Sequence, residues 1–235
     1  MARFRQRAKE SRHYNPRRVN LGDLFIKSLA DHIIEKYHRR HERLREELSE
    51  GVDHVYFVHE LCECTRKSNL RRLYPRLYYA QARKPPVMLG ELIHLGVESL
   101  LDYESEVVVD KVIQIEGERV RVAGIMDLYD KERNIVIEVK YVNRLRNKPK
   151  SKKRGCGLPL EHHRLQASLY AWLTNASHAE IWYITPKSIE TYSLIKPANE
   201  KEVEQLIREE KSPRWPEWEC KYCPYTKICT NNKTA

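Results

Sequence analysis

The sequence predicts an α/β fold in which helices flank a central mixed sheet. At 235 residues the chain suits one domain, or one domain with an appendage. Its hydrophobic residues, 41% of the total, suffice for a packed core, although 32% of the residues are charged. Along the chain a helical pattern precedes three consecutive β-rich runs, and helical and strand patterns then alternate. This order is typical of a sheet covered by helices.

The first part of the chain is predicted to be helical. After a polar arm over residues 1–20, apolar periodicity indicates a long helix over residues 21–50. A second helical stretch is expected from about Leu61 to Leu73. The Pro85-Pro86 pair then precedes a helix over residues 87–101, because proline is favoured in the first turn of a helix.

The second part of the chain carries the strand patterns. Three β-rich runs are separated by turn-forming residues and indicate a meander. A helix, two short strands and a last helix follow, and the tail from Pro213 onward is rich in Trp, Tyr, Pro and Cys. In chain order these elements are expected at residues 106–115, 120–129 and 135–142 (strands), 161–173 (helix), 180–184 and 190–194 (strands) and 199–210 (helix).

The net charge of +10 is concentrated in two segments. Residues 1–18 carry +6 and residues 141–154 carry +7, which leaves the rest of the chain close to neutral at −3. This distribution suits a polyanionic partner such as nucleic acid. No apolar run approaches the ~18 residues needed to span a bilayer, and the charged N-terminus lacks the apolar stretch of a secretory signal. We therefore expect a cytoplasmic protein without membrane association.

Three charged residues of the meander form the most informative pattern. Glu138 and Lys140 lie two positions apart, so on a strand both point to the same face. An ordinary ion pair on a solvated sheet would explain these two residues alone. The turn at residues 130–134, however, folds Asp127 back beside Glu138, and two adjacent carboxylates repel one another unless a cation or a proton lies between them. Oxygen ligands of this kind suit Mg²⁺ or Mn²⁺.

Two predicted helices add polar residues to this set. His94 lies in the helix before the meander, where a single histidine is most often structural, but here it offers a nitrogen ligand that favours Mn²⁺ over Mg²⁺. His163, Gln166 and Tyr170 share one face of the helix after the meander. They form either a polar stripe beside the sheet or the edge of a metal site.

In this order, His94, residues 124–127, Glu138 with Lys140, and Gln166 with Tyr170 resemble the motifs of RecB-type nucleases of the PD-(D/E)XK superfamily. The resemblance implies a restriction-endonuclease-like core over residues 87–212 and hydrolysis of phosphodiester bonds. It also implies that His94, Asp127 and Glu138 bind Mn²⁺ or Mg²⁺. The implied catalytic residues are Lys140, Glu138, Asp127, Gln166 and Tyr170.

A cysteine motif closes the chain. Cys220, Cys223 and Cys229 are spaced as metal ligands, and either zinc or an iron–sulfur cluster accepts four thiolates. Such spacing in a protein without a secretory signal favours metal binding over disulfides. The fourth ligand must come from elsewhere, and Cys62 and Cys64 are both candidates.

The cysteine pattern resembles the CRISPR-associated RecB-like exonucleases and the iron–sulfur nuclease domains of AddB-type repair enzymes. In those proteins one cysteine in a Cys-Pro-Arg-Lys-like context precedes the nuclease core, and Cys64-Thr-Arg-Lys67 matches it except for the proline. The resemblance implies an iron–sulfur cluster, with four irons favoured over two, held by Cys64, Cys220, Cys223 and Cys229. A helical N-terminal region (21–86) would supply the first ligand, and the tail (213–235) would supply the other three.

The resemblance further implies a metal-dependent exonuclease that cuts single-stranded DNA, often 5′→3′, and trims DNA for new CRISPR spacers beside the integrase proteins. The basic segment after Lys140 would guide the DNA phosphates, although a charge run is usually a solvated loop. Two alternatives remain open: a RecB/AddB-like repair or viral nuclease of the same fold, and a non-catalytic DNA-binding module with a zinc tail. The candidate DNA-binding residues are Lys148, Lys150, Lys152, Lys153 and Arg154.

Overall fold

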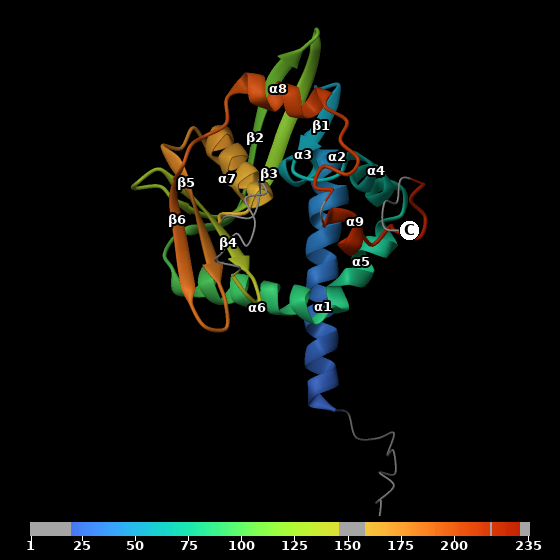
Figure 1. The fold of residues 1–235 in the computed structure, drawn as a ribbon, viewed down its shortest axis with the longest axis vertical. Coiled ribbons are helices and arrows are strands. Elements are labelled where there is room, and N and C mark those ends of the chain that lie inside the picture. Colours follow the sequence, from blue (N-terminus) through green and yellow to red (C-terminus); the bar gives the residue numbers. More distant parts are fainter. Residues whose placement is uncertain (1–19, 146–157, 217, 231–235) are drawn as a thin grey trace, which may run out of the picture.

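The computed structural model describes residues 20–145, 158–216 and 218–230, which form a six-stranded mixed sheet flanked by helices (Figure 1). The strands are β1 (His54–Phe57), β2 (Glu104–Ile115), β3 (Glu118–Asp130), β4 (Ile135–Tyr141), β5 (His178–Ile184) and β6 (Ile189–Ile195). The helices are α1 (Leu21–His38), α2 (Leu44–Leu48), α3 (Val58–Leu61), α4 (Thr65–Leu73), α5 (Pro75–Tyr79), α6 (Pro85–Leu100), α7 (Glu161–Thr174), α8 (Glu200–Arg208) and α9 (Glu219–Tyr222). A π-helical turn (Arg39–Arg43) joins α1 to α2, and a 3₁₀ turn (Ala80–Arg83) joins α5 to α6.

The sheet has the order β1-β3-β4-β5-β6, and β2 pairs with the other edge of β3. β2, β3 and β4 form the predicted antiparallel meander. β5 lies parallel to β4, and the connection between them contains α7. Such crossovers place their helix over the sheet, and α7 accordingly packs on one face of it.

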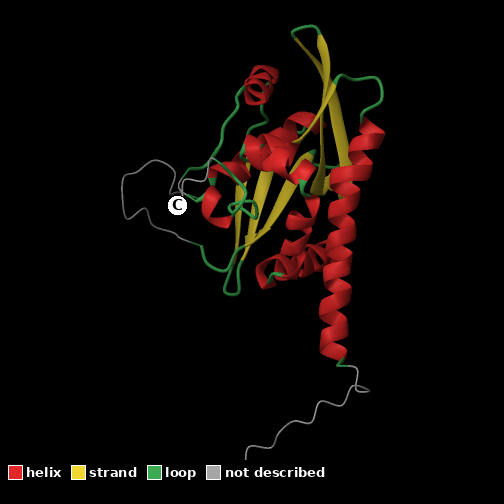
Figure 2. Cartoon of the chain, turned by 90° about the vertical axis from the view of Figure 1, so that its right-hand side faces the viewer, coloured by secondary structure: helices red, strands yellow, loops and turns green. Residues whose placement is uncertain are grey.

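The sheet lies between two helical layers (Figure 2). The main hydrophobic core joins the side chains of α7 to one face of β2, β3 and β5. On the opposite face, Leu44 of α2 packs on Phe57 and Ala123, and α6 covers a separate cluster that includes Leu128 and Ile137. Helices α6 and α7 both contact β3 and β4.

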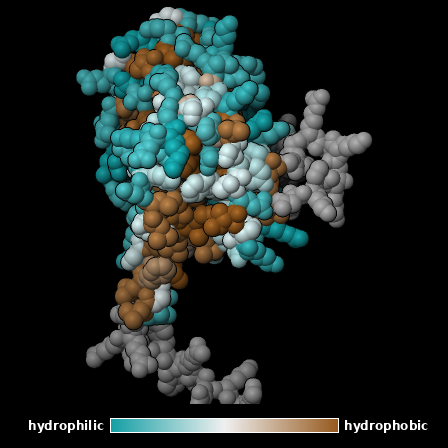
Figure 3. Space-filling view, turned by 90° about the vertical axis from the view of Figure 1, so that its left-hand side faces the viewer, coloured by the Kyte–Doolittle hydropathy of each residue, from teal (hydrophilic) through white to brown (hydrophobic). Residues whose placement is uncertain are grey.

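Helix α1 is a long rod that projects beyond the rest of the molecule (Figures 1 and 2). Its C-terminal half packs through Leu29 and Ile33 on Ala82 and Met88. Its N-terminal half exposes apolar side chains, and Figure 3 shows the brown surface gathered on this projection. Within the described ranges, no helix combines the length and the apolar character that a bilayer crossing requires.

Most predicted elements are confirmed, and the differences lie in the N-terminal region. The three strands of the meander, α6, α7, β5, β6 and α8 all occur within a few residues of their predicted bounds. The helical stretch predicted from about Leu61 to Leu73 occurs as α4, but it begins only at Thr65, and residues 62–64 separate it from α3. The pattern also missed β1, whose four residues are too few for a periodic signal and are held by parallel pairing with β3.

Candidate active site and cysteine pocket

A fork in the sheet places the candidate catalytic residues. β2 pairs along nearly the whole of one edge of β3. On the other edge, β1 pairs with residues 120–123 of β3, whereas β4 pairs with residues 128–130. Residues 124–127, which we call the fork, therefore lie where β1 and β4 separate. Continuing the β3–β4 register by one residue sets Asp127 across from Glu138, as the turn predicted.

The chain rotates at Asp127. Met126 packs in the main core on the α7 side, but Leu128 packs in the cluster under α6. The residue facing Asp127 on β2 is Glu106, whose positive φ of 52° interrupts the ladder between Ser105 and Val107. Such a backbone conformation costs of order 1 kcal/mol for a residue other than glycine and is often found at functional sites.

This rotation lets the Asp127 carboxylate reach groups from two other elements. Its Oδ2 accepts a hydrogen bond of 2.9 Å from the backbone N–H of Val139 on β4. Its Oδ1 lies 3.5 Å from Nδ1 of His94 on α6. The structure thus brings together Asp127, Glu138 and His94, the three residues that the sequence predicted as metal ligands.

Glu138 is fully buried, with 0% of its surface exposed. Lys140 Nζ donates a hydrogen bond to its Oε1, whereas Oε2 has no hydrogen-bond partner among the described residues. Burial raises the pKa of Glu138, the negative charge of Asp127 raises it further, and the result is about 7. The positive charges of Lys140 and Arg40 oppose this rise without cancelling it.

The neighbours of Glu138 keep their usual charges. Burial alone would raise the pKa of Asp127, but His94, Lys140 and the Val139 N–H together lower it. Burial would likewise lower the pKa of Lys140, yet Glu138 and Asp127 raise it. At neutral pH the site therefore contains an ammonium, one firmly ionised carboxylate and a second carboxylate close to its titration point.

Tyr170 of α7 holds the fork in place. Its hydroxyl donates a 2.7 Å hydrogen bond to the carbonyl oxygen of Ile125, inside the fork. A Cβ atom on Gly124 would lie 2.5 Å from the Tyr170 ring, so only glycine allows this close approach. Gln166, predicted beside Tyr170, is half-buried on the same helix. His163 Nδ1 lies 2.8 Å from the Tyr183 hydroxyl rather than at the carboxylates.

Four charged residues near the fork were not identified from the sequence. Lys36 Nζ lies 2.9 Å from both Glu91 Oε1 on α6 and Glu106 Oε1 on β2. Arg40 Nη2, one helical turn later, lies 3.6 Å from Glu106 Oε2. Only the tertiary fold brings α1 beside β2, so no local pattern could have identified this group.

The donor set at the fork suits a hard divalent cation. As they stand, no three His, Cys, Asp or Glu side chains in the described ranges could hold a metal ion. The chemistry nevertheless fits, because the buried Oε2 of Glu138 lacks a partner and a second carboxylate and an imidazole adjoin it. A cation would also remove the repulsion that raises the pKa of Glu138.

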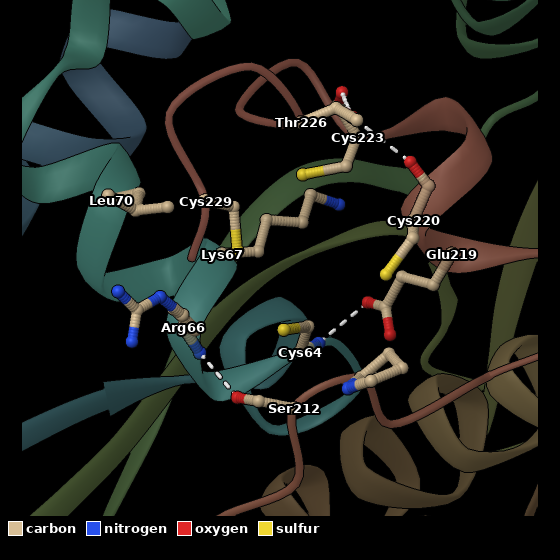
Figure 4. A pocket seen from close by; sticks show the side chains of 11 residues that line it. Cys64, Arg66, Lys67, Leu70, Ser212, Glu219, Cys220, Cys223, Thr226 and Cys229 are labelled. Atoms are coloured by element: carbon tan, nitrogen blue, oxygen red, sulfur yellow. Dashed lines mark hydrogen bonds between the residues drawn. The ribbon is translucent and has the colours of Figure 1, made fainter. Parts of the chain in front are cut away.

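The predicted cysteine ligands line one pocket. Cys64, from the N-terminus of α4, lies there with Cys220, Cys223 and Cys229 of the tail, and Figure 4 shows their sulfur atoms around a common space. Cys62 instead belongs to the main hydrophobic core. Of the two candidates for the distant ligand, only Cys64 lies with the tail cysteines. We call this group of four residues the cysteine pocket.

Hydrogen bonds between backbone and side chains join the tail to the start of α4. The buried Glu219 carboxylate accepts from the backbone N–H groups of Cys64 (2.6 Å), Arg214 (3.0 Å) and Trp215 (3.1 Å). Trp215 Nε1 donates to the Cys62 carbonyl at 2.7 Å. Sequence reasoning missed Glu219, although it directly precedes Cys220, because its partner Cys64 is 155 positions away.

The lining of the cysteine pocket includes two basic side chains and the acidic Glu219. Helix α4 starts at Thr65 with Cys64 as its N-cap, and its first turn contains no acidic residue. Arg66 and Lys67 also line the pocket, and Lys67 Nζ lies 2.7 Å from Glu63 Oε2. Basic residues oppose the dipole at a helix N-terminus, so an anionic occupant would stabilise this end of α4. A metal group bound by four thiolates is anionic, and the residues present fit it.

The candidate DNA-binding residues lie outside the described residues. Lys148, Lys150, Lys152, Lys153 and Arg154 all fall within residues 146–157. The strand before this segment, β4, carries Lys140, whose Nζ bonds to Glu138 beside the fork.

The fold and the site together define a nuclease. The chain matches the model of the PD-(D/E)XK nuclease superfamily over residues 2–230 and belongs to that superfamily. Within it the chain is Cas4-like, as the sequence motifs predicted. It is 32% identical over 202 residues to the CRISPR-associated exonuclease Cas4 of Saccharolobus solfataricus strain P2, and the match covers 79% of this chain and 95% of that protein.

A solved structure confirms the fold. The crystal structure of the protein SSO0001 superimposes with a TM-score of 0.72 at 29% sequence identity. The match covers 92% of this chain and 99% of SSO0001. The prediction of a PD-(D/E)XK core with a mixed sheet between helices is therefore confirmed.

Proposed function

We propose that this nuclease is a divalent-metal-dependent exonuclease that digests single-stranded DNA in the 5′→3′ direction. We further propose that it trims DNA for new CRISPR spacers beside the integrase proteins. One observation supports the enzymatic part most strongly: a fully buried Glu138, with an unpaired Oε2, lies across from Asp127 and is bound by Lys140. The similarity to a CRISPR-associated exonuclease supports the biological part.

In this proposal Asp127, Glu138 and His94 hold Mn²⁺ or Mg²⁺. When bound, such an ion supplies Lewis-acid activation of a water molecule and of the phosphate. Lys140 has a raised pKa and stays an ammonium at neutral pH. As an ammonium it would hold the attacking water and neutralise negative charge developing on the phosphate. Tyr170 fixes the fork, and Gln166 lies beside it on α7.

We propose that the cysteine pocket holds an iron–sulfur cluster, with four irons favoured over two. The four cysteines and the basic first turn of α4 support this assignment. The cluster would reinforce the hydrogen bonds around Glu219 and join α4 to the tail. Because the joined segments are far apart in sequence, metal binding there would contribute to folding free energy.

The basic segment that contains Lys148, Lys150, Lys152, Lys153 and Arg154 is proposed to guide DNA phosphates toward the fork. Its position in the sequence, directly after the strand that carries Lys140, supports this role. Binding through such residues should weaken steeply as the salt concentration rises.

Digestion of end-labelled DNA tests the proposed activity. Wild-type protein should shorten single strands labelled at either end when Mn²⁺ or Mg²⁺ is present, and EDTA should stop the reaction. The order in which the two labels are released gives the direction. Glu138→Ala and Lys140→Ala should each abolish cleavage while the visible absorption of the cluster stays intact. Full activity of both variants would exclude this site, and DNA binding without cleavage by wild-type protein would favour a non-catalytic module.

A further inference from the structure

The π-helical turn after α1 places a positive charge, Arg40, near the fork. Glu106 faces Asp127 across the β2–β3 ladder, and Arg40 Nη2 lies 3.6 Å from Glu106 Oε2. The charge of Arg40 also acts on both carboxylates, because it helps to lower the pKa of Asp127 and opposes the rise in the pKa of Glu138. Arg40 is thus within electrostatic reach of the carboxylate pair, although it is 87 positions before Asp127 in the sequence.

The local helix geometry around Arg40 is unusual. Residues 39–43 form a π-helical turn between α1 and α2. π-Helical turns are rare, wider than α-helical ones and frequent at functional sites. Arg40 lies at the start of this turn, four positions after Lys36, so both side chains face Glu106 from one side of the helix.

The hydrogen-bond donors of Arg40 are only partly satisfied by other residues of the protein. Lys36, at 2.9 Å from Glu106, already compensates that carboxylate at hydrogen-bonding distance. Arg40 is farther from it, and its Nε is shielded from solvent without a hydrogen-bond partner among the described residues. The side chain is 26% exposed, so it remains accessible to a ligand. Several of its five N–H donors therefore remain available.

We propose that Arg40 is a phosphate-binding residue of the nuclease site, contacting the backbone of the DNA strand at the fork. This inference rests on the proposed function. A guanidinium binds phosphate through two parallel hydrogen bonds, and such charge-assisted pairs are strong. Substrate must approach a pair of carboxylates, so a cation besides Lys140 lowers the repulsion between the phosphate and the protein. An ion pair that only anchors α1 to β2 is the competing explanation.

Three variants separate these explanations. Arg40→Gln removes the charge, Arg40→Lys keeps the charge without the two-pronged geometry, and Arg39→Gln is the matched control at an exposed neighbour. For each protein we would measure the midpoint of thermal unfolding, kcat and KM on single-stranded DNA with Mn²⁺, and DNA affinity in EDTA over a range of salt concentrations.

Arg40→Gln should lower kcat/KM by roughly tenfold to a hundredfold, the range expected for a lost charged hydrogen bond. The salt dependence of binding should become shallower by about 0.7 in the log–log slope, which corresponds to one phosphate contact on single-stranded DNA. Arg40→Lys should retain the wild-type slope, and Arg39→Gln should match wild type in all three measurements.

If Arg40→Gln binds DNA with the same dependence on salt concentration as the wild type, the proposal is overturned. A lowered unfolding temperature with unchanged kcat and KM would instead identify Arg40 as an anchor between the helix and β2. If wild-type protein cleaves no DNA with Mn²⁺ or Mg²⁺, the proposed function fails. The binding measurements in EDTA still decide the role of Arg40 in that case, because they require no cleavage.

Discussion

Two opposing demands act on the Glu138 carboxylate. Burial and the neighbouring Asp127 disfavour its charge, whereas the ammonium of Lys140 favours it. A fully buried carboxylate with one unpaired oxygen would be costly as a purely structural group, because a buried acceptor left unpaired costs about 1–3 kcal/mol. The cost is understandable if the free oxygen is reserved for a cation, and this makes Glu138 the most informative residue of the site.

Tyr170 allows a test at the residue scale. Tyr170→Phe keeps the ring against Gly124 but removes the donor to the Ile125 carbonyl. The buried carbonyl would then lose its partner, so the free energy of unfolding should fall by about 1–3 kcal/mol in urea titrations. Cleavage should also slow, because the fork that positions Asp127 loosens.

Tyr192→Phe is the matched control for this change. Tyr192 is a half-buried tyrosine of β6 whose hydroxyl bonds to Glu190, away from the fork. Its loss should change stability by no more than about 0.5 kcal/mol and leave cleavage intact. Equal effects of the two substitutions would show that the Tyr170 hydroxyl does not support the fork.

Some residues of the site could be predicted from the sequence, and others could not. The pairing of Asp127 with Glu138 was predictable, because a short turn joins their strands and fixes the register. Glu219 and Arg40 were not predictable in the same way. Each contacts a partner from a distant element, so their roles depend on how elements pack and leave no periodic trace in the sequence.

At the scale of elements, the interruption between α3 and α4 separates two cysteines. The sequence predicted a helix from about Leu61 to Leu73, which would have placed both Cys62 and Cys64 in its first turn. The break at residues 62–64 instead directs Cys62 into the core and Cys64 to the N-cap of α4. Contacts with the tail determine this break, since the Cys62 carbonyl and the Cys64 N–H both bond to residues of the tail.

This separation predicts different behaviour of the two cysteines. Cys64→Ser should lose bound iron and the visible absorption of protein purified without oxygen, because the pocket loses one of four thiolates. Cys62→Ala should retain both, because Cys62 lies in the hydrophobic core. Elemental analysis and absorption spectra of the two variants provide the comparison.

The same preparations distinguish the metal in the pocket. Zinc in place of iron in wild-type protein would contradict the iron–sulfur proposal while leaving the ligand assignment intact. Retention of metal by Cys64→Ser together with its loss from Cys62→Ala would reverse the ligand assignment.

At the scale of the whole molecule, several histidines are buried among positive charges. Burial, reinforced by nearby arginines, lowers the pKa of His41 to about 2 and that of His59 well below its usual value. On α7, burial and the charge of Lys140 lower the pKa of His162 to about 4 and that of His163 well below the ordinary range. The native protein therefore keeps these four rings neutral under conditions in which an unfolded chain would protonate them.

The sign of the resulting pH dependence follows from proton counting. Below pH 6.5 the unfolded chain binds protons at these histidines and the native state does not, so the free energy of unfolding falls as the pH is lowered. Glu138 acts in the opposite direction between pH 4.5 and about 7, because the native state holds a proton there that the unfolded chain has released. Burial also raises the pKa of Glu98, which acts in the same direction as Glu138. Four histidines outweigh these two carboxylates, and with about 1.4 kcal/mol per pH unit for each group the net loss is roughly 3 kcal/mol per unit.

We therefore expect the unfolding temperature to fall as the pH is lowered from 7 to 5, measured by calorimetry at constant ionic strength. Loss of a metal group in acid would act in the same direction, so a histidine variant is needed to isolate the contribution of the buried rings. His59→Leu removes a ring whose Nε2 is shielded and unpaired among the described residues, and it should flatten the dependence. An identical slope for wild type and His59→Leu would show that this buried ring does not contribute to the acid sensitivity.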